Sequence, residues 1–451
     1  MTHIPLFHGP VPISVVEKTL QMKTPTAEDS QLPPMFSLRQ RFPESTPVPL
    51  ETAIEKEMGQ VIAQLSPGNR VAVGVGSRGI TNLRPIIAGL LAQLKNAGAV
   101  PYIIPAMGSH GGATAEAQAQ LLAEYGISEA ELGVPIAAGM EVETIGKTAQ
   151  GTDVVWAKTA LQADAVMVVN RIKPHTDFSG KIGSGLIKMA VVGLGKRVGA
   201  SNFHRAASHH GYEAELRQRI QIVSRHTKLL GGLGLIEDQG HQTVHLEWVD
   251  KATLEDREEA LFQQSRNLMP RIPFKFVDLL IIDRIGKNIS GAGMDPNIIA
   301  RSIHGYLTSP PTEPAPLTIR RIFVRDLTPE THGNAIGIGL ADITTKRLVD
   351  KMNPEVTFIN ALTALSTNGA KVPIYFETDR EAILRVLDTL ALPSLQDARI
   401  LRIQDTLNLE HITASQAYFG EAKGRDDLEI TGEPELIAFK DDQLAEPPQR
   451  G

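Results

Sequence analysis

Three histidines and one lysine of this chain lie in or beside Gly-rich segments that follow apolar runs. His110 lies in MGSHGG, His175 in IKPHTDF and His204 in SNFH, while Lys188 precedes the apolar run MAVVGLG. An imidazole titrates near neutral pH, so two histidines at neighbouring strand ends that face one cleft could serve as acid and base. A lone histidine in a loop is more often structural, and Lys188 could equally be a solvated loop residue.

The segment GVGSRG (residues 74–79) matches the GxGxxG pattern of dinucleotide-binding loops. That fingerprint also needs an acid about 20 residues further on to bind the ribose hydroxyls. Residues 98–107 contain no acid, so an NAD site is disfavoured, and no GxxxxGK[ST] motif of a P-loop occurs. Gly-rich loops at strand ends could still hold a phosphate with backbone N–H groups, with Arg78 supplying positive charge, although ordinary turn geometry explains any one of them.

A repeated order of apolar strand, Gly-rich loop and amphipathic helix positions these segments. Strands are predicted over residues 71–75, 100–106 and 164–170, with helices over 85–98 and about 115–125. The pattern restarts near Phe276 with the apolar run VDLLIIDRI, which is typical of a strand buried on both faces. Open α/β sheets bind ligands at the carboxyl ends of their strands, where these loops fall.

This pattern predicts an α/β fold with two domains, largely parallel sheets and an active-site cleft between the domains. We expect an extended N-terminal arm over residues 1–50 that lies over a domain, an N-terminal α/β domain over 51–275 and a C-terminal α/β domain over 276–451. The charged segment from about 210 to 270 is expected to be a helical connector. The last dozen residues are expected to be frayed.

The composition limits the class of protein. The formal net charge is −6, which disfavours a net basic surface for binding nucleic acid. Cysteine is absent, which excludes a disulfide, a zinc–thiolate site and a thiol nucleophile. The N-terminus lacks the pattern of a secretory signal, and no apolar run of about 18 residues occurs. These features predict a soluble, cytoplasmic protein without nucleic-acid or membrane partners.

Taken in order, these motifs resemble the nickel-pincer lactate racemase family. The resemblance rests on Gly108-Ser109-His110, on Pro174-His175, on the Ser/Gly loop that leads to Lys188-Met189-Ala190-Val191-Val192-Gly193, and on His204, sixteen residues after Lys188. It is densest over residues 100–205. As a family, these enzymes are racemases and epimerases of 2-hydroxy acids with two α/β domains, which agrees with the fold predicted above.

The resemblance implies roles for individual residues. Lys188 resembles the lysine that carries the nickel-pincer nucleotide (pyridinium-3,5-bisthiocarboxylic acid mononucleotide nickel) through a thioamide link. His204 resembles the one protein ligand of nickel, and His110 and His175 resemble the paired acid/base residues. The soft metal ligands would then come from the cofactor, which fits the absence of cysteine.

Further candidates come from the loops around these residues. Arg78 is similar to the arginine of the family's first strand-end motif, but the acid expected shortly before it is missing. The other candidates for binding the cofactor are Ser77, Gly108 and Ser179. Lys181, and Lys287 and Asn288 in GKNISGAGMD, are weaker candidates for binding the substrate.

The sequence therefore predicts a racemase or epimerase that inverts C2 of a 2-hydroxy carboxylic acid, with polar groups near the site weakly favouring a sugar acid or dicarboxylate over lactate. The partner would be this small substrate, while the oligomeric state is left open. Two alternatives remain: a non-catalytic nucleotide- or cofactor-binding protein of the same fold, and an NAD-type oxidoreductase, which the missing acid disfavours.

Overall fold

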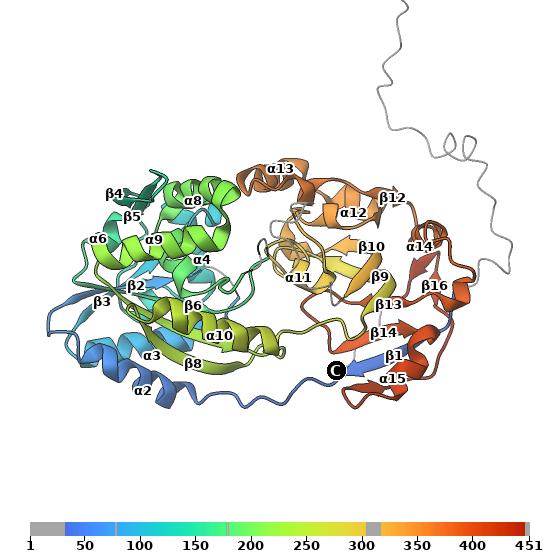
Figure 1. Cartoon of the computed structure of the whole chain (residues 1–451), viewed down its shortest axis with the longest axis horizontal. Helices are drawn as coiled ribbons and strands as arrows, with labels where there is room; N and C mark the ends of the chain where they lie inside the picture. The colour runs from blue at the N-terminus through green and yellow to red at the C-terminus, as the bar shows by residue number, and fades with distance from the viewer. Residues whose placement is uncertain (1–31, 77–78, 177, 179, 304–316, 447–451) are drawn as a thin grey trace, which may run out of the picture.

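The computed structural model describes residues 32–76, 79–176, 178, 180–303 and 317–446. The described residues form two lobes that lie side by side, each built around its own sheet (Figure 1). The chain passes between the lobes after β1 and again between α10 and β9, so both connections are single segments (Figure 1).

The N-terminal lobe contains a five-stranded sheet in the order β3-β2-β6-β7-β8. All neighbouring pairs are parallel except β7 with β8. Its strands are β2 (Arg70–Val75), β3 (Val100–Pro105), β6 (Ala165–Arg171), β7 (Leu229–Glu237) and β8 (Thr243–Asp250). The hairpin of β4 (Val142–Lys147) and β5 (Asp153–Ala157) forms a separate small sheet.

Helices cover both faces of this sheet because its strands are apolar on both sides. Ala72 packs into the core under α8, α9 and α10, whereas its neighbours Val71 and Val73 pack into the core under α2 and α3. This alternation follows from the two-residue repeat of a strand. The helices of this lobe are α2 (Leu50–Ile62), α3 (Leu83–Asn96), α4 (Ala115–Glu124), α8 (Lys196–His210), α9 (Tyr212–His226) and α10 (Leu254–Leu268).

The C-terminal lobe contains an eight-stranded sheet in the order β12-β11-β10-β9-β13-β14-β1-β15. The neighbouring pairs from β12 to β13 are parallel, whereas β13 with β14, β14 with β1 and β1 with β15 are antiparallel. The strands are β9 (Phe276–Ile285), β10 (Thr318–Leu327), β11 (Ile343–Thr345), β12 (Ile374–Phe376), β13 (Ile400–Ile403), β14 (His411–Ser415), β1 (Met35–Gln40) and β15 (Leu428–Ile430). Its helices include α11 (Pro296–Ile299), α12 (Lys346–Lys351), α13 (Pro354–Thr363), α14 (Asp379–Asp388) and α15 (Phe419–Lys423).

The α/β class with largely parallel sheets is confirmed, but three details of the prediction are wrong. Residues 35–40 are not part of a covering arm, because they form β1 inside the C-terminal sheet, with Phe36 and Leu38 each 1% exposed. The segment 210–270 contains β7 and β8 as well as helices. β7 was missed because its sequence, LLGGLGLIE, contains three glycines, which are uncommon inside strands. Leu444 near the C-terminus is buried and belongs to β17 (Gln443–Leu444).

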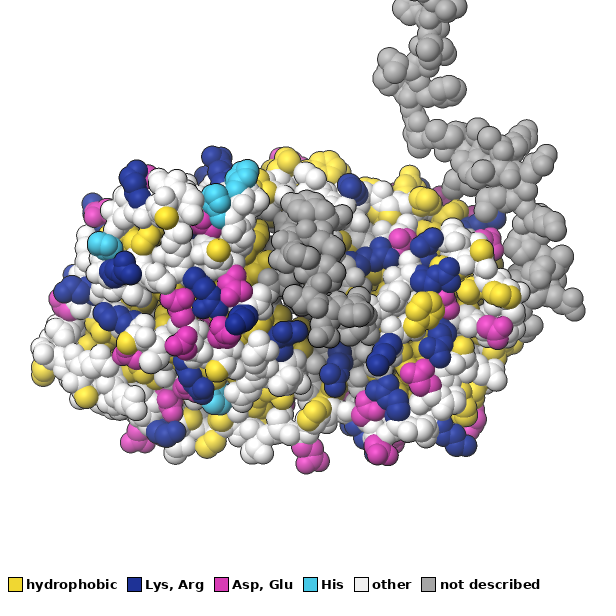
Figure 2. Space-filling view, viewed as in Figure 1, with side chains coloured by type: hydrophobic (Ala, Val, Ile, Leu, Met, Phe, Trp, Pro, Cys, Tyr) yellow, Lys and Arg dark blue, Asp and Glu magenta, His cyan; other side chains and the backbone are white. Residues whose placement is uncertain are grey.

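The surface carries both signs of charge, and its exposed large apolar side chains are concentrated on the C-terminal lobe. Figure 2 shows hydrophobic side chains over α13 at the upper edge of this lobe, where Phe358, Ile359 and Leu362 are exposed. Among the described residues, no helix combines the length and the apolar run that crossing a membrane requires.

Candidate active site

The candidate site begins where β6 ends. Lys173 and Ser184 exchange two backbone hydrogen bonds of 2.8 and 2.9 Å, so the chain between them forms a closed loop that contains His175. The side chain of Asn170, the next-to-last residue of β6, donates to the Gly185 carbonyl at 3.0 Å. The strand end thereby fixes both sides of the loop.

The approach of α10 requires glycine at two positions, Gly183 in this loop and Gly185 directly after it. A Cβ atom on Gly183 would lie 2.7 Å from the Phe262 ring and 2.6 Å from the Lys173 carbonyl oxygen. A Cβ atom on Gly185 would lie 2.4 Å from Oε1 of Glu258. Glycine at these two positions is therefore a packing requirement, since a larger residue at either would separate this segment from the helix.

Lys188 and His175 are brought into direct contact. The Nζ atom of Lys188 contacts Nε2 of His175, which is 7% exposed, while Lys188 is half-buried. Lys188 ends the short helix α7 (Leu186–Lys188), which continues as a π-helical turn over Met189–Gly193 before α8 begins. π-Helical turns occur frequently at functional sites, because the extra residue in the turn displaces side chains from the regular helical positions.

An aromatic stack leads from His175 to His204. The His175 ring stacks on Phe178 with centroids 4.3 Å apart, and Phe178 stacks on Tyr212 at 4.6 Å. The hydroxyl of Tyr212 lies 3.4 Å from Nδ1 of His204, which projects from α8. The predicted acid/base residue and the predicted metal ligand are thus connected through two aromatic side chains at the start of α9 and in the loop.

The predicted second acid/base residue lies in a loop that packs on the same segment. Gly108 has a φ of +59°, and its N–H donates to the carbonyl of Gly193 at 3.1 Å. Gln118 of α4 donates to the carbonyls of Gly108 and His110, each at 3.1 Å, and the His110 residue is exposed. The backbone on which His110 sits is therefore held between α4 and the end of the π-helical turn.

The C-terminal lobe contacts the site through a residue that the sequence did not single out. Asn297 of α11 donates from Nδ2 to the backbone carbonyl of His175 at 3.1 Å. Asp295 caps α11 and accepts from the same amide group at 2.9 Å. The sequence signal was present in the run Asp-Pro-Asn, which is typical of a helix start.

The weaker candidates for substrate binding make contacts of other kinds. Lys181 is exposed, and its Nζ pairs with Glu259 at 3.2 Å, a surface ion pair that contributes little stability. Lys287 donates from Nζ to the Gly291 carbonyl at 2.8 Å, and Asn288 accepts from the Thr328 hydroxyl at 2.6 Å. Ser77, Arg78 and Ser179 lie outside the described residues.

The glycine at the end of β2 has a local reason that does not involve a nucleotide. A Cβ atom on Gly76 would lie 2.5 Å from Cε of Met189, so the backbone at Gly76 passes directly over the side chain of this residue in the π-helical turn. The nearby pair of Arg171 and Glu237 is largely buried, and Glu237 also accepts from the amide of Thr81 at 2.8 Å. This carboxylate therefore connects the loop after β2 with the end of β6.

Two buried ionisable groups next to the site were also missed. Burial lowers the pKa of Lys196 to about 8, and its Nζ donates to the carbonyl of Pro105, the last residue of β3, at 2.7 Å. Burial raises the pKa of Glu258 to about 7, although the amides of Ile187 and Leu186 and the charge of Arg217 act in the opposite direction. Perturbed pKa values of this kind are common around functional sites and also occur in structural networks.

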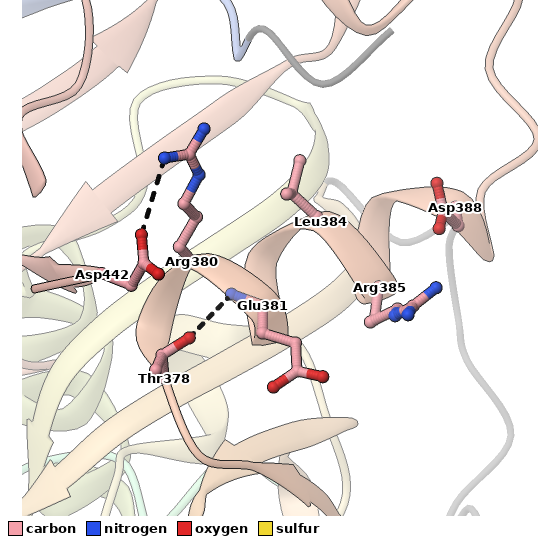
Figure 3. A pocket seen from close by; sticks show the side chains of 7 residues that line it. All are labelled: Thr378, Arg380, Glu381, Leu384, Arg385, Asp388 and Asp442. Atoms are coloured by element: carbon pink, nitrogen blue, oxygen red, sulfur yellow. Dashed lines mark hydrogen bonds and ion pairs between the residues drawn. The ribbon is translucent and has the colours of Figure 1, made fainter. Parts of the chain in front are cut away.

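Two surface hollows lie away from these residues. The hollow in Figure 3 is formed over α14, where Thr378 caps the helix by accepting from the Glu381 amide at 3.2 Å and Arg380 pairs with Asp442 at 3.5 Å. A second hollow lies between α9 and α10. Neither includes a predicted site residue, so the predicted cleft between the lobes stays a prediction. The lining residues of the first are Thr378, Arg380, Glu381, Leu384, Arg385, Asp388 and Asp442.

The donor set limits how a metal could be held. Among the described residues, no group of three or more His, Asp or Glu side chains could bind a metal ion by itself. A metal at His204 would therefore need most of its ligands from a bound group. This is what a cofactor that carries its own sulfur and carbon ligands would supply, so the residues present fit such a group.

The fold and this cluster define a two-domain α/β protein with a histidine–lysine site carried by the N-terminal lobe. Residues 50–216 match the family model of the lactate racemase N-terminal domain. The chain is also similar to the solved structure of the lactate racemase apoprotein from Thermoanaerobacterium thermosaccharolyticum, with 14% identity and a TM-score of 0.48 over 85% of this chain and 96% of that chain. The comparison with curated proteins gives no match.

Proposed function

We propose that the protein is a racemase or epimerase that inverts C2 of a 2-hydroxy carboxylic acid with a nickel-pincer nucleotide. The observation that carries the proposal is the contact between Lys188 and His175 at one end of the stack that leads to His204. The family of the N-terminal domain supports the same class of reaction. Lys188 would hold the nucleotide and His204 would bind its nickel.

The chemistry explains why a cofactor and two bases are needed. The α-hydrogen of a 2-hydroxy carboxylate is poorly acidic, so removing it as a proton would demand strong stabilisation of a carbanion. The cofactor, when bound, supplies an acceptor for this hydrogen as hydride. The protein must then move the hydroxyl proton, and the two enantiomers present their hydroxyl groups on different sides.

The histidines are suited to this proton transfer. His175 would take the hydroxyl proton from one enantiomer at Nε2 and His110 from the other, each returning it in the reverse direction. Phe178 stacks on the His175 ring and restricts its orientation, and Asn297 holds the backbone of the same residue. The 2-keto acid formed in this way is planar at C2, so return of the hydrogen to the opposite face would invert the centre.

The experiment uses the cofactor-loaded enzyme and a panel of C2-deuterated 2-hydroxy acids. We expect one nickel per chain, an added cofactor mass on the peptide that contains Lys188, and racemisation of at least one acid with the deuterium kept at C2. Loss of the label to water would exclude hydride transfer. Binding of the cofactor without turnover of any acid would favour the non-catalytic alternative.

A further inference from the structure

Glu258 is a completely buried carboxylic acid in the part of the chain that was expected only to connect the lobes. It lies on α10, which packs against α7, and it is 0% exposed. Its Oε2 atom accepts from the amide of Ile187 at 2.9 Å, and the Leu186 amide also stabilises its charged form. Among the described residues, Oε1 has no hydrogen-bond partner.

The energetic cost of this burial is not offset by a paired cation. The Arg217 guanidinium acts on Glu258 only at a distance, because its own hydrogen bonds go to Glu213, Glu255 and Glu259. A buried carboxyl group with incomplete hydrogen bonding is unfavourable, and an apolar residue at this position of α10 would avoid that cost. The same apolar residue would, however, leave the buried amide of Ile187 without its acceptor, so the reason for a carboxyl group here lies in what it holds.

Its position supplies that reason. Residues 186 and 187 form the first turn of the segment that ends in Lys188. The backbone amides at the start of a helix have no acceptor within the helix, and Glu258 accepts from the Ile187 amide instead. A carboxyl group that holds these amides fixes the backbone direction of the turn. The lysine on the next residue then reaches His175.

We propose that Glu258 is a positioning residue that directs Lys188 toward His175 and thereby sets the geometry in which the cofactor is attached. The proposal rests on the proposed function for the role of Lys188. The contact between Lys188 and His175 is present in the protein without cofactor, so the positioning role can be tested on the apoprotein.

The test compares ¹⁵N-histidine-labelled apoprotein of the wild type with E258A, E258Q and the control E259Q. Glu259 is the next residue of the same helix, and its carboxylate pairs at the surface with Lys181 and Arg217. At one fixed pH we expect the His175 imidazole resonances to shift by more than their line width in E258A, and by less in E258Q, whose amide oxygen can still accept from Ile187. The resonances of His226 should stay in place in all variants, and so should those of His175 in E259Q.

Unchanged His175 resonances in folded E258A would overturn the proposal, whatever the enzyme does. If E258A does not fold, E258D decides, because it keeps the carboxyl group but withdraws it by one methylene from the amides; unchanged His175 resonances there would overturn the proposal equally. On the loaded enzyme, we expect E258A to lower the fraction of Lys188 that carries the cofactor. The two proposals can fail separately. If the loaded wild-type enzyme racemises no acid but the His175 resonances still shift between the wild type and E258A, the proposed function is refuted and the positioning role of Glu258 stands.

Discussion

Nζ of Lys188 contacts Nε2 of His175, although the two residues lie thirteen positions apart in the sequence. The contact exists because the backbone pairing of Lys173 with Ser184 closes the loop between them and α10 presses on its glycines. A cationic or nucleophilic amine is thereby held against an imidazole in a half-buried position, an arrangement that can place a tethered group beside an acid/base residue.

Replacing Lys188 with Met should prevent attachment of the cofactor while the fold is kept. Met preserves most of the apolar stem, so we expect a small change in the free energy of unfolding and a complete loss of the added mass on this peptide. Mass spectrometry after loading measures the result. K181M removes an exposed amine from the same loop and should load normally; equal loading of K188M would exclude Lys188 as the attachment site.

Replacing either His110 or His175 with Gln should lower the racemisation rate in both directions. In the proposed reaction, one imidazole would serve as base for each enantiomer and the other would complete the exchange. Each single change would then remove a required proton carrier and should cost about 10²- to 10⁴-fold. Polarimetry from each pure enantiomer gives the two rates. H226Q, at the end of α9, is the control, and a double variant as active as the wild type would remove the acid/base assignment.

Replacing Tyr212 with Phe should weaken nickel retention without unfolding the protein. The ring stack on Phe178 is kept, whereas the hydroxyl that lies 3.4 Å from Nδ1 of His204 is lost. Partners on the second nitrogen of a ligating histidine orient the ring, and their removal typically lowers metal affinity about 10- to 100-fold. Competition of the loaded enzyme with a chelator measures this. Y102F removes another buried tyrosine hydroxyl of the lobe, which donates to the Thr159 carbonyl, and should leave nickel retention unchanged.

Glu258 should make the protein less stable as the pH rises from about 4.5 to about 7. Burial raises its folded-state pKa to about 7, so between the unfolded and folded pKa values the folded state binds more protons than the unfolded state. Its contribution to the free energy of unfolding is therefore largest below the unfolded pKa and falls by roughly 3 kcal/mol across this interval. Urea unfolding of the wild type and E258Q at several pH values isolates the slope, because other titrating groups cancel in the difference. Two parallel curves would contradict the prediction.

Replacing Gly185 with Ala should destabilise the protein because of Glu258. The new Cβ would lie 2.4 Å from Oε1 of the carboxyl group, and overpacking of this kind costs about 1 to 3 kcal/mol. E258A removes the obstructing atoms, so the added cost of G185A should be much smaller in that background. Chemical unfolding of the four proteins completes the cycle, and additive effects would show that the carboxyl group is not the obstacle.

The main strands and their Gly-rich ends were predictable because their causes are local. The apolar runs that form β2, β3, β6 and β9 are bounded by turn residues, and the order of strand, loop and helix defines an α/β protein. β1 was not predictable in this way, since its place between β14 and β15 depends on pairing with strands more than 370 residues away. Local patterns carry no information about a partner so distant.

The sequence by itself determined the α/β class and the motifs that contain His110, His175, Lys188 and His204. It also excluded cysteine thiolates as metal ligands, because cysteine is absent. Only the tertiary structure decided which side chains meet: Lys188 with His175, Tyr212 with His204, Asn297 with the His175 backbone, and Glu258 with the turn before Lys188. Periodicity and motifs indicate how each segment pairs its own backbone hydrogen-bonding groups and which of its faces is apolar and buried. Contacts between distant segments arise from close packing of helices and loops. This packing is so tight that a methyl group added at Gly185 would overlap with the carboxyl group of Glu258.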